Sequence, residues 1–223
     1  MELLEEILNQ NNLNKAYKKV VANKGVAGVD GITVEEEFDY LKENKDRIIN
    51  QIRKRRYKPQ PVKRVQIPKE NGKMRNLGIP TVTDRIIQQA IFQVISPIFE
   101  KQFNDNSFGF RPNRSCEQAV VRALKYLNDG YEWIVDIDLE RFFDTVKQDK
   151  LITIIGRTIT DGDVVSLIRK YLSAGVMEKG IVKATTVGTP QGGNLSPLLS
   201  NIMLNELDKE LEARELKFVR YAD

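Results

Sequence analysis

The chain has 223 residues, 41% of them hydrophobic, and a net charge of +4. This length and composition indicate one folded core or a bilobed unit rather than a disordered chain. The sequence contains no histidine, which excludes His-based acid/base catalysis, Ser-His and Cys-His nucleophilic systems, and most zinc and non-haem iron sites. The single cysteine, Cys116, cannot form an internal disulfide or a thiolate metal cage. An active site must therefore use carboxylates, lysine, hydroxyls or backbone groups.

The sequence carries no recognisable membrane or export signal. No apolar run approaches the ~20 residues that a helix needs to span a bilayer. The N-terminal Met-Glu-Leu-Leu-Glu-Glu is acidic, whereas a signal peptide begins with basic residues. We therefore expect a cytoplasmic protein with no membrane partner.

The N-terminal part of the chain is predicted to be helical. Residues 2–24 follow a helical apolar pattern that is interrupted near Asn11. Thr33 can cap a second helix, with Glu36 three residues later. A third helix is expected to stop near Pro59.

The excess positive charge lies in one stretch, residues 42–75, which we call the basic segment. It holds 13 Lys and Arg against 3 acidic residues, while the rest of the chain holds 22 basic and 28 acidic residues. A solvated helix face would explain a charge run, but closely spaced cations fit a polyanion better because they can neutralise consecutive phosphates. Charge alone does not distinguish RNA, DNA and an acidic membrane surface. The candidate contacts are Arg53, Lys54, Arg55, Arg56, Lys63 and Arg64.

Two strands and a buried helix are predicted next. Residues 62–67 and 74–79 read as strands of a hairpin, because Asn71-Gly72 between them is a strong turn signal. Apolar residues at helical spacing then predict a buried helix over residues 86–99, with Pro97 bending or restarting it.

The second half of the chain is predicted to alternate helices with extended segments. Ser115 and Gln118 form a capping box for a helix that ends near Gly130. Alternating apolar residues then predict a strand over 132–139. Residues 189–197 read as a glycine-containing turn that leads into another helix, with a proline in its first turn.

Two carboxylates stand at predicted strand ends. Asp138 lies near the end of the 132–139 strand, and Asp223 follows a predicted strand over 218–221. A single Asp at a strand end is usually a helix cap or a surface charge. Two of them in a protein without histidine suit an oxygen-ligand site for Mg²⁺. On pattern alone, Asp136 competes with Asp138 for this role.

Six motifs stand in the order found in one protein family. They are Val-Lys-Arg-Val-Gln-Ile-Pro-Lys (62–69), Lys-Met-Arg-Asn-Leu-Gly-Ile-Pro (73–80), Phe-Gly-Phe-Arg-Pro-Asn-Arg-Ser (108–115), Asp-Ile-Asp-Leu-Glu-Arg-Phe-Phe-Asp (136–144), Thr-Pro-Gln-Gly-Gly-Asn-Leu-Ser-Pro-Leu-Leu-Ser-Asn-Ile (189–202) and Tyr-Ala-Asp (221–223). Over nearly its whole length the chain resembles the reverse transcriptases encoded by bacterial group II introns, also called maturases. The resemblance implies an RNA-directed DNA polymerase that also binds intron RNA to assist splicing and mobility.

The resemblance implies roles for the carboxylates. Asp138 and Asp223 would be catalytic metal ligands, joined by the backbone carbonyl of Leu139. Two Mg²⁺ ions would act in nucleotidyl transfer. The family pattern favours Asp138 over Asp136.

The resemblance also implies how substrates bind. Phe143 would lie under the sugar of a dNTP and reject a 2′-hydroxyl, and Gln191 would line the nucleotide site. Lys69 and Arg75 would hold the triphosphate. Arg111 would lie near the template or the nucleotide pocket. The implied partners are dNTPs, an RNA template with a DNA primer, and group II intron RNA.

One departure from the family pattern sets a further expectation. The chain ends one residue before the second Asp of the Tyr-Ala-Asp-Asp turn, so we expect a fragment without the thumb and any DNA-binding or endonuclease region of the family. We expect such a fragment to be inactive or very weak in primer extension. Apolar surface that a thumb would cover leaves a homodimer as an open alternative.

The fold that the resemblance implies is α+β, with right-hand polymerase fingers and palm and a small antiparallel palm sheet backed by helices. We expect an N-terminal extension and fingers over 1–83, palm over 84–148, fingers or an insertion over 149–186, and palm over 187–223. Two alternative functions stay open. One is a non-catalytic RNA-binding maturase module, and the other is a reverse transcriptase of a retron, a CRISPR locus or a diversity-generating element.

Overall fold

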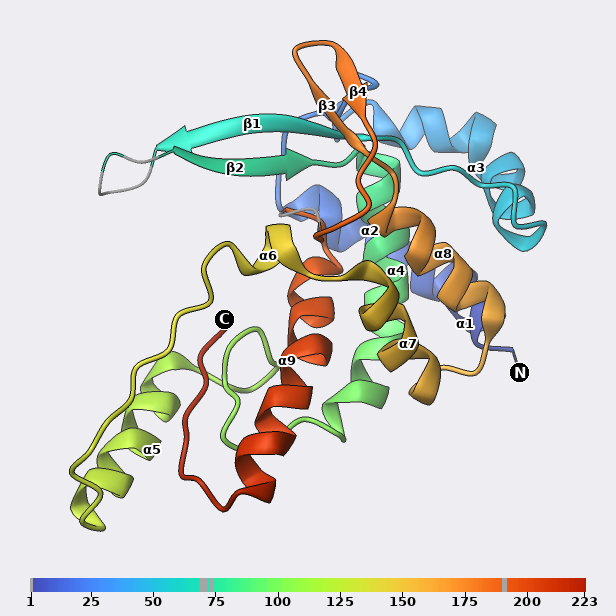
Figure 1. The fold of residues 1–223 in the computed structure, drawn as a ribbon. Coiled ribbons are helices and arrows are strands. Elements are labelled where there is room, and N and C mark those ends of the chain that lie inside the picture. The colour runs from blue at the N-terminus through green and yellow to red at the C-terminus, as the bar shows by residue number, and fades with distance from the viewer. Residues whose placement is uncertain (1, 69–71, 73, 190–191) are drawn as a thin grey trace.

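The computed structural model describes residues 2–68, 72, 74–189 and 192–223. Helices form most of this part of the chain, and a small sheet lies across one end of them (Figure 1). The helices are α1 (Leu3–Ile7), α2 (Gln10–Ala22), α3 (Glu37–Arg53), α4 (Val82–Glu100), α5 (Cys116–Asn128), α6 (Phe142–Thr145), α7 (Gln148–Thr158), α8 (Gly162–Leu172) and α9 (Ser196–Ala213). The α+β class is confirmed.

The sheet is built from two hairpins. Its strands are β1 (Val62–Pro68), β2 (Met74–Ile79), β3 (Val176–Glu178) and β4 (Ile181–Lys183), in the order β2-β1-β3-β4. Within each hairpin the strands are antiparallel, and β1 pairs with β3 in parallel, with Val62 opposite Val176. The predicted 62–79 hairpin is confirmed, whereas β3 and β4 were not predicted.

Helix α4 is the centre of the core. Its side chains Ile87, Ala90 and Ile91 are buried, and α1, α2 and α9 contact it. Burying one such large aliphatic side chain stabilises the fold by about 1.5–3 kcal/mol. Thr81 caps the helix by accepting a hydrogen bond from the Asp84 amide at 3.1 Å. No helix in the described ranges is both long enough and apolar enough to cross a membrane.

Helix ends follow the predicted capping signals. Both hydrogen bonds of the capping box between Ser115 and Gln118 are present at the start of α5. Pro197 lies in the first turn of α9. The N-terminal helical region is divided between α1 and α2, close to Asn11. The two helices predicted between Thr33 and Pro59 form the single helix α3.

The two predicted strands next to the carboxylates are not formed. Residues 131–139 run as an extended chain from the end of α5 back to α6 (Figure 1), with no strand beside them in the described structure. Trp133 is 97% exposed and Val135 is 83% exposed. Residues 218–221 make a single bridge, between Ser107 and Arg220. The sheet therefore consists of the 62–79 and 176–183 hairpins, because an alternating sequence forms a strand only where a partner supplies the hydrogen bonds.

Candidate active site

A cavity of about 230 Å³ lies where β1 and β2 meet α6 and the segment before α9. The walls come from separate stretches of the chain, some of them more than a hundred positions apart, which folding brings together (Figure 1). The lining residues include Arg64, Asn76, Arg141, Phe143, Asp144 and Thr189. The cavity therefore combines an aromatic wall with cations and hydrogen-bonding groups.

Phe143 forms the aromatic wall of this cavity. The residue is 9% exposed, and its ring packs edge-on against Phe142 with the centroids 5.6 Å apart. The Phe143 carbonyl accepts a hydrogen bond from the Thr189 amide at 2.7 Å. Gly188 has φ +88°, and a Cβ there would lie 2.9 Å from the same carbonyl oxygen. Close backbone packing thus holds Phe143 in place beside the cavity.

Two arginines give the cavity positive charge. Arg64 on β1 makes no side-chain hydrogen bond or ion pair within the described ranges. Arg141 is exposed and approaches Asp144 at 3.4 Å. A guanidinium can donate two parallel hydrogen bonds to a phosphate, so both residues suit a phosphorylated ligand. Arg64 was predicted as an RNA contact, and Arg141 was not singled out although it lies within the 136–144 motif.

The predicted metal ligands lie on exposed chain. Asp138 and Asp223 are exposed, and neither side chain forms a hydrogen bond or an ion pair with the described residues. Leu139 is partly buried against the core. Carboxylates are the donors that Mg²⁺ prefers. However, the described residues contain no group of three or more acidic, His or Cys side chains that could hold a metal ion. Within the described residues, Asp138 and Asp223 are therefore not joined by a third such side chain.

The predicted triphosphate and nucleotide contacts are only partly described. Lys69 and Gln191 lie outside the described residues, and Arg75 is placed by its backbone in β2, opposite Ile67. The chain after Gln191 packs directly on β2, because Gly192 has φ +106° and a Cβ there would lie 2.3 Å from the Gly78 carbonyl oxygen. Only glycine allows this approach.

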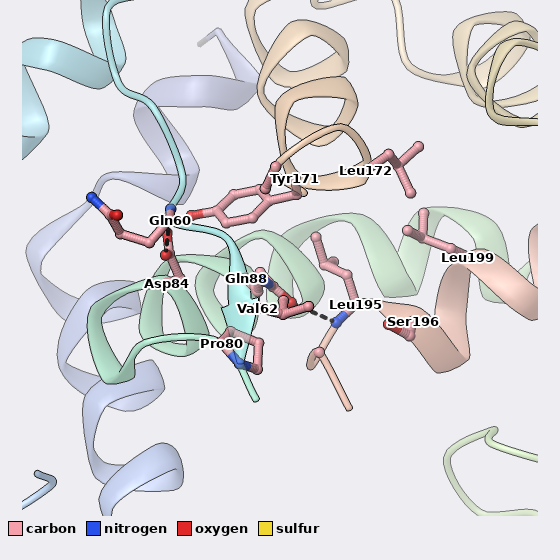
Figure 2. Close-up of a pocket in the computed structure, with 12 residues that line it drawn as sticks. Gln60, Val62, Pro80, Asp84, Gln88, Tyr171, Leu172, Leu195, Ser196 and Leu199 are labelled. Atoms are coloured by element: carbon pink, nitrogen blue, oxygen red, sulfur yellow. Dashed lines mark hydrogen bonds between the residues drawn. The ribbon is translucent and has the colours of Figure 1, made fainter. Parts of the chain in front are cut away.

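Two groups of hydrogen-bonded polar residues lie beside a small space between β1, α4, α8 and the start of α9 (Figure 2). The Asp84 carboxylate accepts hydrogen bonds from the Tyr57 hydroxyl at 2.7 Å and from the Gln60 amide at 3.0 Å. Burial raises the pKa of Asp84. The Gln88 side chain accepts from the Leu195 amide at 3.4 Å. The enclosed space measures about 20 Å³, enough for about one water molecule, so these groups are scaffold rather than a substrate site.

The basic segment contains both paired and unpaired cations. Arg53 donates two hydrogen bonds to the Glu5 carboxylate, at 2.8 and 2.7 Å, and Arg55 forms an ion pair with Asp163. Lys54 and Arg56 are exposed and have no ion-pair partner within the described chain. Lys63 is also exposed, on β1. Of the four consecutive cations, Arg53 and Arg55 are therefore already paired with carboxylates, whereas Lys54 and Arg56 have no such partner among the described residues.

Arg111 is buried and binds groups of the protein itself. Its side chain is 3% exposed, and it pairs with Glu100 at 2.7 Å. It also donates to the carbonyls of Asn104 and Ser107, at 2.6 and 2.7 Å. The guanidinium is therefore occupied in closing the loop after α4, and its burial leaves little surface for a template.

Comparison with known proteins decides the family. Residues 67–223 match the family described as reverse transcriptase (RNA-dependent DNA polymerase). The chain belongs to this family. It is 42% identical over 206 residues to the group II intron-encoded protein LtrA of Lactococcus lactis subsp. cremoris, covering 92% of this chain and 34% of LtrA. It is 39% identical over 220 residues to Protein YkfC of Escherichia coli (strain K12), covering 96% of this chain and 58% of YkfC.

A solved structure shares the fold. The partial Cas6-RT-Cas1–Cas2 complex matches with a TM-score of 0.64 and 23% identity, over 100% of this chain and 37% of the solved chain. At this identity the likeness concerns the fold alone. The relatives confirm the group II intron resemblance of the sequence. This chain spans between about a third and three fifths of their length.

Proposed function

We propose that this chain forms the nucleotide site of an RNA-directed DNA polymerase encoded by a group II intron. The observation that carries the proposal is the cavity of about 230 Å³ between β1, β2 and α6, with Phe143 as its wall and Arg64 and Arg141 as its cations. An aromatic wall beside two guanidinium groups suits a nucleoside triphosphate, which presents a sugar next to a chain of phosphates. The 42% identity to LtrA supports the intron type.

The chemistry proposed is nucleotidyl transfer. A primer 3′-hydroxyl attacks the α-phosphorus of a dNTP, and pyrophosphate leaves. Catalysis of this step depends mainly on positioning and on neutralising phosphate charge. Arg64 and Arg141 neutralise the triphosphate, and the Phe143 ring occupies the space that a ribose 2′-hydroxyl would need. Mg²⁺, with Asp138, Asp223 and the Leu139 carbonyl as ligands, stays a prediction.

The division into fingers and palm is part of the same proposal. Residues 1–83 and 149–186 act as fingers, and residues 84–148 and 187–223 act as palm. All four ranges contribute lining residues to the cavity. A nucleotide bound there would contact both parts, which supports this division.

Primer extension tests the polymerase proposal. The assay uses an RNA template, a DNA primer, dNTPs and Mg²⁺, and it compares the wild-type chain with Asp138→Asn and Asp136→Asn. Both residues are exposed on the same extended segment, so Asp136→Asn is a matched control. Extension should fall about 100-fold or more for Asp138→Asn and stay near wild type for Asp136→Asn. We expect extension by the wild-type chain to be weak. Extension that is not reduced in Asp138→Asn, or that falls equally in Asp136→Asn, would contradict the proposal.

A second candidate function is binding of intron RNA without catalysis. The exposed cations Lys54, Arg56 and Lys63 favour it, because they leave a positive surface that no described carboxylate neutralises. The two functions are compatible in one protein. RNA binding with no binding of dNTP would leave this second function alone. A homodimer and a cytoplasmic location also stay predictions.

A further inference from the structure

The Phe-Gly-Phe-Arg motif and the C-terminal Tyr-Ala-Asp motif meet at a buried ion pair. Arg220 donates from Nε and Nη2 to the two carboxylate oxygens of Asp208 on α9, at 2.8 and 2.7 Å. The Asp208 side chain is 0% exposed and the Arg220 side chain 10%. The remaining nitrogen, Nη1, donates to the Asn201 side-chain oxygen at 2.9 Å and to the Ala222 carbonyl at 2.8 Å. Every nitrogen of the guanidinium is therefore used.

The backbone on both sides of Arg220 is held as well. The Phe108 amide donates to the Arg220 carbonyl at 2.9 Å, and the Arg220 amide donates to the Asn106 carbonyl at 2.8 Å. Gly109 lies against the next residues, because a Cβ there would lie 2.2 Å from the Ala222 nitrogen. The Asn201 side chain donates to the Gly109 carbonyl at 2.9 Å. Asn201 thus joins the loop at Gly109 to the Arg220 side chain.

Stability alone is a weak explanation for this arrangement. Removing two charges from water costs free energy that their attraction often only offsets, so a buried ion pair is poor evidence of stabilisation. Such a pair can instead fix geometry, because both charges are satisfied in one arrangement only. Arg220 reaches past its partner to the Ala222 carbonyl, and Ala222 has φ +68°. The next residue is Asp223.

Arg220 is unsuited to binding a phosphate itself. Its charge is matched by Asp208, and its donors are occupied. Asp138 shows the contrast: it follows an extended segment that has no comparable anchor in the described structure. Of the two predicted catalytic carboxylates, only Asp223 follows directly on a clamped backbone.

We infer that Arg220 is a positioning residue: with Asp208 and Asn201 it fixes the backbone at Ala222, so that the Asp223 carboxylate is presented in one place. The inference rests on the proposed polymerase function for its use of Asp223. The contacts of Arg220 with Asp208, Asn201 and the Ala222 carbonyl, which we call the clamp, belong to the fold and do not depend on that function. Gly109, in the 108–115 motif, belongs to it because any side chain would displace Ala222.

Hydrogen exchange and primer extension, measured on the same variants, test the inference. The variant is Arg220→Gln, with Arg220→Lys as a milder change that retains the charge. The matched control is Arg214→Gln, since Arg214 forms an ion pair with Glu210 at 2.6 Å in which both side chains are largely exposed. The Phe108 and Arg220 amides should exchange at least tenfold faster in Arg220→Gln and at the wild-type rate in Arg214→Gln. The Lys variant should lie between them, and it provides the answer if Arg220→Gln does not fold.

The kinetic result separates positioning from a general loss of structure. In Arg220→Gln the kcat of primer extension should fall at least tenfold while the KM for dNTP stays within twofold, because the Phe143 cavity is untouched. Unchanged amide exchange would overturn the clamp, and faster exchange with unchanged kcat would overturn the positioning role. If extension by the wild-type chain is too weak for kinetics, the relative binding of dATP and ATP tests the proposed function instead. The exchange data then still decide whether Arg220 holds the backbone.

Discussion

The β1–β2 hairpin and the segment over residues 131–139 were both predicted to form strands, and their structures differ. Both mix apolar with polar residues and contain β-branched side chains. The hairpin strands pair with each other, and β1 also pairs with β3. The 131–139 segment has no described strand beside it, and Trp133 is almost fully exposed. The difference shows that alternation predicts an extended chain, whereas a ladder partner decides whether it becomes a strand.

The largest expected difference between packed and unpaired regions concerns stability. Ile91 in α4 is fully buried, so Ile91→Ala should lower the free energy of unfolding by about 2–5 kcal/mol. Val135→Ala removes an exposed side chain and should change it by less than about 0.5 kcal/mol. Urea denaturation measures both. A comparable loss in the two variants would mean that the 131–139 segment is packed in solution.

A buried carboxylate of the packed core, Glu37 in α3, should make the free energy of unfolding depend on pH. Glu37 is buried, accepts a hydrogen bond from Thr83 at 2.7 Å, and has one oxygen without a partner in the described structure. Burial raises its pKa to about 7. Between pH 4.5 and 7 the folded state therefore retains a proton that the unfolded state releases, so stability falls as the pH rises, by up to about 3 kcal/mol.

The variant Glu37→Gln isolates this effect. It removes the titrating group, so the variant should gain stability relative to wild type as the pH rises from 5 to 8. Asp136→Asn, in the exposed segment, is the control for a change from carboxylate to amide. Denaturation at several pH values gives the comparison. Parallel curves for wild type and Glu37→Gln would show that Glu37 does not titrate in this range.

A smaller difference is expected within the basic segment. Neutralising the unpaired cations, in Lys54→Gln/Arg56→Gln, should reduce the salt dependence of RNA binding by about 0.7 in slope for each phosphate that these side chains no longer neutralise. Arg53→Gln/Arg55→Gln removes cations already paired with Glu5 and Asp163, so its slope should change less. Filter-binding titrations at several salt concentrations measure the slopes. Equal changes would mean that these ion pairs open when RNA binds.

Local signals in the sequence predicted much of the fold. The capping box at Ser115 and the Asn71-Gly72 turn signal act over a few residues, and the elements beside them are confirmed. The β3–β4 hairpin was missed because its strands have three residues each, too short for a periodic pattern. Its turn does carry one sequence signal, Gly180, which together with Lys179 adopts a positive φ in the structure.

The site was less predictable, because its contacts join distant parts of the chain. Arg111 was assigned to the template, but its partner Glu100 lies across a loop that sequence spacing does not reveal. Arg141 lies beside Phe143 in sequence, yet only folding places it and Arg64 around one cavity. The clamp at Arg220 depends on Asp208 and Asn201, which point to it only once α9 is in place.

The most direct test of the nucleotide cavity is the relative affinity of the chain for dATP and ATP. Equilibrium binding of both nucleotides is measured for wild type, Phe143→Leu and Phe142→Leu. The last is the matched control, because Phe142 is equally buried but does not line the cavity. Wild type and Phe142→Leu should prefer dATP, and Phe143→Leu should reduce that preference at least tenfold by making room for the 2′-hydroxyl. An equal preference in all three proteins would contradict the assignment of this cavity to the nucleotide.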